Sequence, residues 1–358
     1  MTTVLWNSFT IGDIRLDHRL AMAPMTRGRS TPKGVPTQMN ATYYAQRASM
    51  ALIISEGTQP SADGQGYPLT PGIYSPQQIA GWRLVTDAVH EAGGRIIIQL
   101  MHVGRISHPL NTPHGRQPVA PSAVKAVGTM FTSVGPLSFP EPRALSREEI
   151  AQTVRDHRRA AAAAIAAGAD GVEIHAANGY LVHQFLSSNV NQRTDEYGGS
   201  IENRIRFAVE VASGVAEEIG AQRTGIVISP GNPFNDIVEE DVDELYGALV
   251  RALSPLGLAY LNVVHCGDEN LVRAIRSDWP TALLLNRRGA DIEARVKDLD
   301  DGLADVITVG TQTLANPDLV ARLRVGAPLN EVDQTTFYGG GERGYVDYPT
   351  LDSVAQSG

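Results

Sequence analysis

Eight short apolar runs, separated by segments of helical periodicity, constrain the fold of this chain more than any other feature. The runs occupy 19–25, 51–57, 95–100, 171–176, 224–229, 259–265, 281–286 and 305–310. The helical segments occupy 37–48, 76–92, 147–167, 200–219, 241–253, 269–277, 291–299 and 317–324. Continuous apolar strands alternating with helices indicate a parallel sheet covered on both faces. Eight such units predict an α/β fold, a closed (β/α)8 TIM barrel, and the alternative is a doubly wound open sheet.

Three segments lie outside this repeating pattern. Residues 1–18 alternate around "TIGD" and predict a β-hairpin that closes the bottom of the barrel. Residues 101–146, after the third strand, form a long irregular excursion rich in Pro, Gly and His, which is typical of a functional lid. Residues 337–358 read as a C-terminal loop and tail, in which "GGGERG" lacks the flanking strand and helix of a dinucleotide fingerprint. Without a linker or a solenoid repeat, we expect one barrel domain over 1–358.

Charge and composition narrow the classes of partner. The 358 residues carry a formal net charge of -9, which disfavours a surface that must neutralise nucleic-acid phosphates. No apolar run approaches the ~20 residues that a membrane-spanning helix needs. Cys266 is the single cysteine, and "MTTVLWNSFT" does not resemble a secretory signal, so we expect a cytoplasmic protein. Both a monomer and a homo-oligomer are compatible with the sequence.

Polar residues that follow the strands define the expected chemistry, because barrels carry their reactive groups at the carboxyl ends of the strands. No lysine occurs at any of these ends, which argues against a Schiff-base aldolase. The first strand has no H-x-H pair and the last strand ends without a carboxylate, so we expect no metal site. The ends that do carry polar groups include Glu56, Gln99, His102, the segment 175–180 and His265.

The turn after the fourth strand carries the strongest candidates. His175, Asn178 and Tyr180 are spaced so that the first two can converge on one acceptor while the phenol approaches from above. Two donors on a carbonyl or nitro oxygen would polarise a conjugated C=C bond, and a phenol could then deliver a proton. The alternative is structural, with His175 bonded to the backbone and Tyr180 packed in a wall.

Several motifs resemble the old yellow enzyme family of flavin-dependent ene-reductases. They are "APMTRGRS" (23–30), "ISEGTQPSADGQGYPLTPGIYS" (54–75), "QLMHVGRISH" (99–108), "GVEIHAANGYLVHQFLSSNVNQRTDEYGGSIENRIRF" (171–207), "ANPDLVARL" (315–323) and "FYGGGERGYVDYP" (337–349). The similarity runs nearly end to end, and the stretch 183–207 is its most specific part.

The resemblance implies a barrel with FMN over its mouth, reduced by NAD(P)H and reoxidised by a small electron-poor alkene. Cofactor contacts would come from the strand ends, with Thr26 on the flavin C4 carbonyl, the Gly57 amide nearby and Gln99 on the pyrimidine edge. The remaining matched cofactor positions are Pro24, Met25, Arg288, Gly289, Gly310 and Thr311. His175 and Asn178 would bind the activating group of the substrate, Tyr180 would donate the proton, and Tyr67 and Tyr338 would line the pocket.

Three positions depart from the family pattern, and all of them face the cofactor. Val227 stands where an arginine neutralises the flavin N1–C2 edge, and Thr311 replaces the phosphate-binding arginine. Arg288 stands where the first glycine of a pair is expected, leaving Gly289. Arg287 or Arg288 could supply the missing phosphate partner, because the loops after strands seven and eight form the usual phosphate site. In a fourth change, Met101 replaces a common tryptophan and reshapes the substrate pocket.

Two functional hypotheses follow from these features. The first is an FMN-dependent ene-reductase that acts on α,β-unsaturated carbonyl or nitro compounds. The second is a divergent barrel with weak or no FMN binding, which would act as a deazaflavin-dependent reductase, a redox-neutral isomerase or a small-molecule binding protein.

Overall fold

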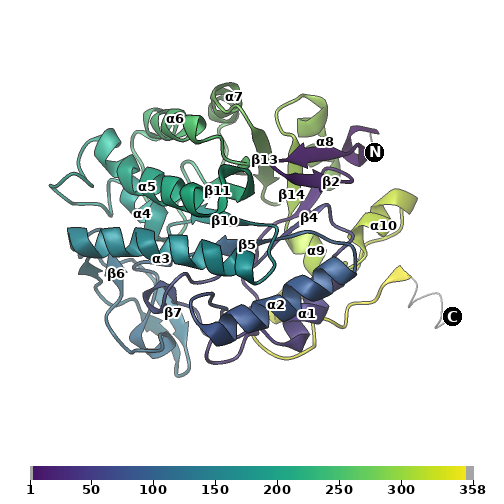
Figure 1. The fold of residues 1–358 in the computed structure, drawn as a ribbon, viewed down its shortest axis with the longest axis horizontal. Helices are drawn as coiled ribbons and strands as arrows, with labels where there is room; N and C mark the ends of the chain where they lie inside the picture. The colour runs from purple at the N-terminus through teal and green to yellow at the C-terminus, as the bar shows by residue number, and fades with distance from the viewer. Residues whose placement is uncertain (1–2, 352–358) are drawn as a thin grey trace.

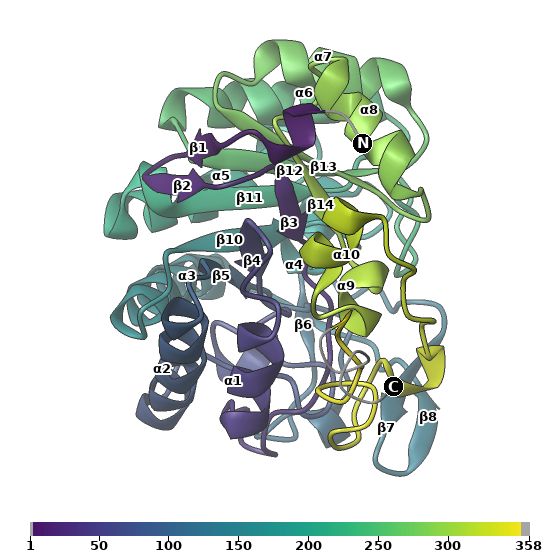
Figure 2. The same cartoon turned by 90° about the vertical axis from the view of Figure 1, so that its right-hand side faces the viewer.

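The predicted barrel is confirmed by a computed structural model, which describes residues 3–351. Eight parallel strands close in the order β10-β11-β12-β13-β14-β3-β4-β5, so neighbouring strands follow the chain (Figure 2). Their bounds are β3 Leu20–Met22, β4 Leu52–Ile54, β5 Ile96–Leu100, β10 Gly171–Ala176, β11 Thr224–Ile228, β12 Tyr260–His265, β13 Ala282–Arg287 and β14 Val306–Val309. All residues of β5, β10 and β11 are buried, as expected for strands covered on both sides.

Helices surround the barrel, as Figure 1 shows for α2, α3, α5 and α6. The helices are α1 Gln38–Ala45, α2 Pro76–Glu91, α3 Arg147–Ala166, α4 Leu181–Leu186, α5 Ile201–Ile219, α6 Val242–Leu253, α7 Glu269–Asp278, α8 Ile292–Asp300, α9 Thr311–Ala315 and α10 Leu319–Val325. Ser75 and Ser146 cap α2 and α3 through capping boxes, which explains why both helices begin where the sequence predicts. None of the helices among residues 3–351 is long and apolar enough to cross a membrane.

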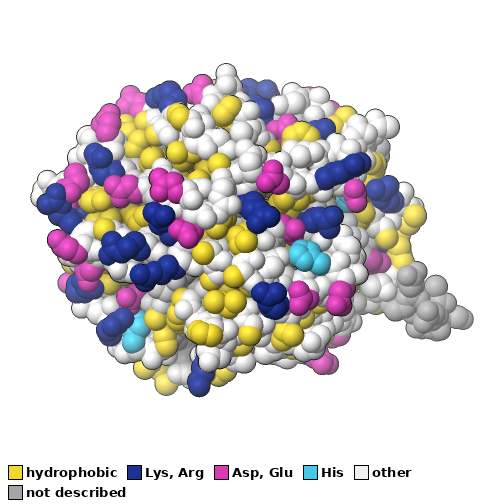
Figure 3. Space-filling view, viewed as in Figure 1, with side chains coloured by type: hydrophobic (Ala, Val, Ile, Leu, Met, Phe, Trp, Pro, Cys, Tyr) yellow, Lys and Arg dark blue, Asp and Glu magenta, His cyan; other side chains and the backbone are white. Residues whose placement is uncertain are grey.

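The outer surface carries charges of both signs. On the face in Figure 3, Lys and Arg side chains are interspersed with Asp and Glu. Some of them pair between neighbouring helices, as Arg158 of α3 does with Glu217 and Glu218 of α5. Mixed charges on this face give no broad basic patch there.

The N-terminal hairpin closes the end of the barrel where the strands begin. It pairs β1 Phe9–Ile11 with β2 Ile14–Leu16, and residues 1–2 of the predicted segment lie outside the described residues. Ile11 and Leu16 pack in one cluster with strand residues such as Leu52 and Tyr260. The hairpin therefore seals the bottom and leaves the opposite end for a site.

The excursion 101–146 is less irregular than its sequence suggests, because it holds two small sheets. Strands β6 Val119–Ala120 and β9 Arg143–Ala144 pair in parallel, and β7 Thr129–Thr132 pairs with β8 Gly135–Ser138 as a hairpin. Short 3-10 helices complete the fold at Thr3–Trp6, Ala62–Gly64, Pro109–Asn111, Ala221–Arg223, Ser254–Leu256 and Gln334–Thr336.

The C-terminal loop is tied to the loop after β3 by two buried arginines. Arg27 donates to the carbonyls of residues 336, 337 and 344, and Arg29 donates to those of 336, 337, 341 and 343. The Arg27 guanidinium also lies 5.1 Å from the ring centroids of Tyr43 and Tyr345, which stack on each other. Residues 352–358 of the predicted tail lie outside the described residues.

Candidate active site

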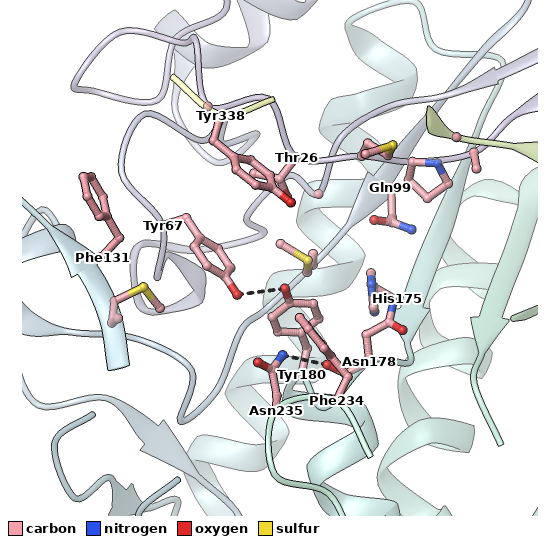
Figure 4. A pocket seen from close by; sticks show the side chains of 18 of the residues that line it. Thr26, Tyr67, Gln99, Phe131, His175, Asn178, Tyr180, Phe234, Asn235 and Tyr338 are labelled. Atoms are coloured by element: carbon pink, nitrogen blue, oxygen red, sulfur yellow. Dashed lines mark hydrogen bonds between the residues drawn. The ribbon is translucent and has the colours of Figure 1, made fainter. Parts of the chain in front are cut away.

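A cavity of about 1610 Å³ opens at the carboxyl ends of the barrel strands. Its wall includes the residues that the resemblance matched to cofactor and substrate contacts, and Figure 4 shows part of it. These residues are Pro24, Met25, Thr26, Gly57, Tyr67, Gln99, His175, Asn178, Tyr180, Arg288, Gly289, Gly310, Thr311 and Tyr338. Side chains from separate strand ends thus meet in one space, as the architecture requires.

The turn that follows β10 has an unusual backbone, which aims its side chains into the cavity. Asn178 has φ +53 and Gly179 has φ +75, a left-handed region that asparagine and glycine tolerate best. The Gly179 amide donates to Nδ1 of the buried His183, and Nε2 of His183 contacts Glu239 and Tyr246. The second histidine of "EIHAANGYLVHQF" therefore supports the turn from behind and does not line the cavity.

His175 presents a ring N–H to the cavity. Its Nδ1 accepts the backbone amide of Ala177 at 3.3 Å, which leaves the proton of the neutral ring on Nε2. Burial lowers the pKa of His175 to about 3, with the nearby His183 adding to the effect. The imidazole is consequently neutral at physiological pH, and its Nε2–H has no acceptor among the described residues. The structural alternative, in which His175 is bonded to the backbone, applies to Nδ1 alone, because Nε2 remains available to a ligand.

Asn178 presents an amide N–H₂, and its orientation is fixed by a chain of hydrogen bonds. Asn232 accepts the amide of Phe234 through Oδ1 and so donates through Nδ2 to Oδ1 of Asn178 at 2.8 Å. Because Oδ1 of Asn178 is occupied as an acceptor, its Nδ2 is the group left for the cavity. Nδ2 makes no hydrogen bond to a described residue. The structure thus provides two unused donors from one turn.

Tyr180 lies beside these donors with a neutral phenol. Its ring is edge-on to His175, with ring centroids 5.0 Å apart, and its hydroxyl lies 3.0 Å from that of Tyr67 (Figure 4). Burial, with the neighbouring Tyr67 phenol, raises the pKa of Tyr180 well above its ordinary value. Tyr338, from the C-terminal loop, is 68% exposed at the mouth. Tyr180 therefore holds its proton and shares it with one phenolic neighbour.

Gln99 of β5 and Glu173 of the neighbouring strand β10 form a buried polar pair next to His175. Nε2 of Gln99 donates to Glu173 at 2.7 Å, and Nδ2 of Asn262 donates to the same carboxyl at 3.0 Å. This leaves Oε1 of Gln99 as the acceptor that can face a ligand. Glu173 has no cation within ion-pair distance among the described residues, and burial raises its pKa to about 7.

Departures from the family pattern have visible structural consequences. Val227 packs in a small apolar cluster with Ala177 and Val264, so no positive charge replaces the expected arginine there. Arg287 is paired with Glu269 and Asp298 and is not part of the cavity wall, which removes it as a phosphate partner. Arg288 is exposed on the cavity wall without an ion pair in the described part of the chain.

Other strand-end residues support the structure without reaching the cavity. Glu56 accepts the backbone amides of Arg27 and Gly28 at 3.0 Å. His102 accepts the amide of Gly104 through Nδ1, and His265 pairs with Glu269. These three residues are absent from the cavity wall.

Several wall residues were not predicted from the sequence. They are Leu110, Val127 and Phe131 in the excursion, Phe234 and Asn235 in the β11–α6 loop, Asn262 in β12, and Arg295 in α8. The carboxyl end of a barrel strand could have pointed to Asn262. The wall residues of the excursion and of the β11–α6 loop follow no regular sequence pattern, and Arg295 lies inside an ordinary helical pattern. No motif therefore pointed to any of them.

Comparisons with known proteins agree with this geometry. A model of the NADH:flavin oxidoreductase / NADH oxidase family matches residues 4–330. The chain belongs to this family. The resemblance to old yellow enzymes is therefore confirmed, and the protein is an NAD(P)H:flavin oxidoreductase.

Relatives of this flavin oxidoreductase cover it almost completely. It is 43% identical over 97% of its length to a probable flavin mononucleotide-dependent alkene reductase of Leishmania infantum, covering 98% of that protein. It is 41% identical over 98% of its length to 12-oxophytodienoate reductase 1 of Oryza sativa subsp. japonica, covering 94% of that protein. The structure matches morphinone reductase with a TM-score of 0.94 at 43% identity, covering 98% of this chain and 97% of the other.

A further match is morphinone reductase in complex with tetrahydroNAD, at a TM-score of 0.94 and 44% identity, covering 98% of each chain. These comparisons support FMN as the cofactor and a nicotinamide as the reductant. The deazaflavin considered from the sequence has no support in them.

The cavity wall fits FMN at most of its expected contacts. Oε1 of Gln99 and the hydroxyl of Thr26, which makes no hydrogen bond to another described residue, offer hydrogen bonds to a ring edge. At Gly57 a Cβ would lie 2.4 Å from the Met101 side chain, so a larger residue at this position would displace Met101 in the wall. The altered contacts lie at Val227, which has no charge, and at the β13–β14 end, where position 311 is threonine.

Proposed function

We propose that the protein reduces the C=C bond of α,β-unsaturated carbonyl or nitro compounds with FMN as cofactor. One observation carries this proposal: two donors without partners among the described residues and a neutral phenol converge on the same wall of a cavity that fits a flavin. A carbonyl oxygen is the natural acceptor for Nε2–H of His175 and Nδ2–H of Asn178. The names of the relatives support the same chemistry.

FMN held by Thr26, Gln99 and the Gly57 amide would supply the hydride chemistry between NAD(P)H and the β-carbon of the alkene. The chain's own residues prepare the substrate for that transfer. His175 and Asn178 hold the activating oxygen and withdraw electron density from the double bond. Tyr180 gives its proton to the α-carbon, and the Tyr67 hydroxyl stabilises the phenolate that remains. The excursion 101–146 acts as a lid over the substrate side, with Met101 shaping the pocket beneath it.

The test of this mechanism is Tyr180→Phe, measured on the two half-reactions separately by stopped-flow absorbance of the flavin. We expect alkene reduction to slow by roughly 10²–10⁴-fold, the range for loss of a general acid. Reduction of the flavin by nicotinamide should be nearly unchanged, because that step needs no proton from the phenol.

Tyr67→Phe is the matched control, since it removes one hydroxyl from the same pair but leaves Tyr180 in place. We expect a smaller decrease in alkene reduction for this variant. Equal loss of both half-reactions in Tyr180→Phe would show that Tyr180 shapes the flavin site and is not the proton donor.

A further inference from the structure

Arg295 occupies an unexpected place between the ends of two barrel strands. It belongs to α8, yet Nη1 donates to the Thr308 carbonyl of β14 at 2.9 Å and lies 3.5 Å from Oδ1 of Asn286 in β13. Nε donates to the Ala290 carbonyl at 3.2 Å. These bonds fix the guanidinium at the carboxyl ends of β13 and β14, where the residue forms part of the cavity wall.

The charge of this guanidinium has no carboxylate partner. Arg295 is 5% exposed, and no acidic group among residues 3–351 lies within ion-pair distance of it, since Asp298 is paired with Arg287. Nη2 makes no hydrogen bond to a described residue. Burial lowers the pKa of Arg295, but an arginine remains charged at neutral pH. A buried cation without a partner is unfavourable, so an anion from outside the chain would stabilise it.

Neighbouring wall residues add to this preference for an anion. Arg288 lies on the same side of the cavity, is exposed and makes no ion pair among the described residues. Within the part of the chain that the structure describes, Asp236 is the one acidic residue of the wall, and it contacts Arg105 and the excursion. As far as the residues are described, the cavity wall at the β13–β14 end therefore carries two cations and no carboxylate. Asp298 and Asp291 lie behind this wall, near enough to act on the pKa of Arg295 but beyond ion-pair distance. Loops after the seventh and eighth strands are the common phosphate site of barrel enzymes.

We propose that Arg295, assisted by Arg288, binds the terminal phosphate of the flavin. This inference rests on flavin binding in the proposed function and adds the residue that selects the phosphorylated cofactor. Thr311 cannot supply a positive charge, and Arg287 is occupied by two carboxylates. The positive charge that the family pattern places at position 311, after β14, would thus come in this chain from Arg295 in α8, before β14.

The test compares FMN with riboflavin, which lacks the phosphate, by quenching of flavin fluorescence on titration with flavin-free protein. In Arg295→Met, which preserves the packing of the stem, we expect FMN affinity to fall ~10-fold or more, as for a lost charged hydrogen bond. Riboflavin affinity should stay within about twofold, because the ring contacts remain. Arg251→Met is the matched control, since it removes the same charge from an exposed site in α6 outside the cavity.

Parallel weakening of FMN and riboflavin in Arg295→Met would overturn the proposal, because it would indicate a purely structural role. An unchanged ratio of the two affinities would overturn it as well. If the thermal unfolding of Arg295→Met shows that it does not fold, Arg295→Lys replaces it. That variant keeps the charge with a poorer fit and should lower the FMN-to-riboflavin preference several-fold, whereas an unchanged preference would overturn the proposal.

The outcome is distinguishable from failure of the proposed function. A wild-type protein that reduces alkenes while Arg295→Met keeps its FMN preference would refute the phosphate contact alone. A protein that selects FMN through Arg295 but does not reduce activated alkenes would refute the reaction alone.

Discussion

At the scale of single residues, the site works through hydrogen-bonding groups that the protein leaves without partners. Nε2 of His175 and Nδ2 of Asn178 are free because the opposite atom of each side chain is already occupied by a neighbour. The sequence predicts the residue types, but it does not show which atom is free. That depends on Asn232 and the Ala177 amide, whose contacts arise only when the turn is folded.

Val227 is the residue whose substitution most directly tests the cofactor edge. Val227→Arg introduces a cation into the cavity wall beside His175 and Asn262, at the position where the family pattern places a charge against the reduced flavin. We expect FMN to bind about tenfold more tightly, in line with 1.5–3 kcal/mol for a charged hydrogen bond. Flavin fluorescence titration measures the change, and Val227→Met controls for side-chain length. Unchanged affinity would mean that the wild-type wall already compensates for the missing charge.

Glu173 gives a prediction for the pH dependence of stability. Its pKa rises from an ordinary value of 4.5 to about 7 in the folded protein, so the folded state binds more protons between these values. The free energy of unfolding therefore decreases as pH rises from about 4.5 through 7. The loss from this one group is on the order of 3 kcal/mol at 1.36 kcal/mol per pKa unit.

Glu173→Gln removes this titration, and chemical denaturation at several pH values measures its effect. Relative to wild type, the variant should gain stability as pH rises from 5 to 8. A constant difference between the two proteins over that range would contradict the prediction and show that Glu173 is already ionised at pH 5.

At the scale of elements, one arginine joins two segments of the cavity rim. Arg105 has a fully buried side chain, and it donates to Val124 in the excursion and to Asn235 and Asp236 in the β11–α6 loop. Asn111 ties the excursion from another side, through Gly66 and Phe131. The rim is therefore held by side-chain to backbone bonds where strand pairing is sparse.

Arg105→Met should loosen both rim segments without altering the barrel. We expect a several-fold higher KM for the alkene and faster proteolytic cleavage within 101–146, because the donors that hold these carbonyls are lost. Affinity for FMN should change little, since Arg105 is not part of the cavity wall. Exposed Arg116 offers a control in the same excursion, and equal effects in Arg116→Met would argue against a specific role for Arg105.

At the scale of the whole molecule, the barrel was predictable because the sequence signals of its strands and helices are local and repeat along the chain. Each strand is a short apolar run, and each helix has its own periodicity and capping residues, so errors are confined to element ends. The excursion was harder, because the small sheets formed by 119–120, 129–132, 135–138 and 143–144 are too short for a pattern to show. Arg295 was missed for another reason. Its segment has the pattern of a surface helix, and only the packing of α8 turns this side chain toward the cavity.

The hydrogen bonds by which Arg27 and Arg29 hold the C-terminal loop have a consequence for the synthesis of the enzyme. Both arginines bind carbonyls more than 300 positions further along the chain. During synthesis these two cations emerge from the ribosome long before their acceptors do. The wall that carries Tyr338 is thus assembled last, and a nascent chain arrested before residue 336 would hold a barrel whose entrance is unfinished.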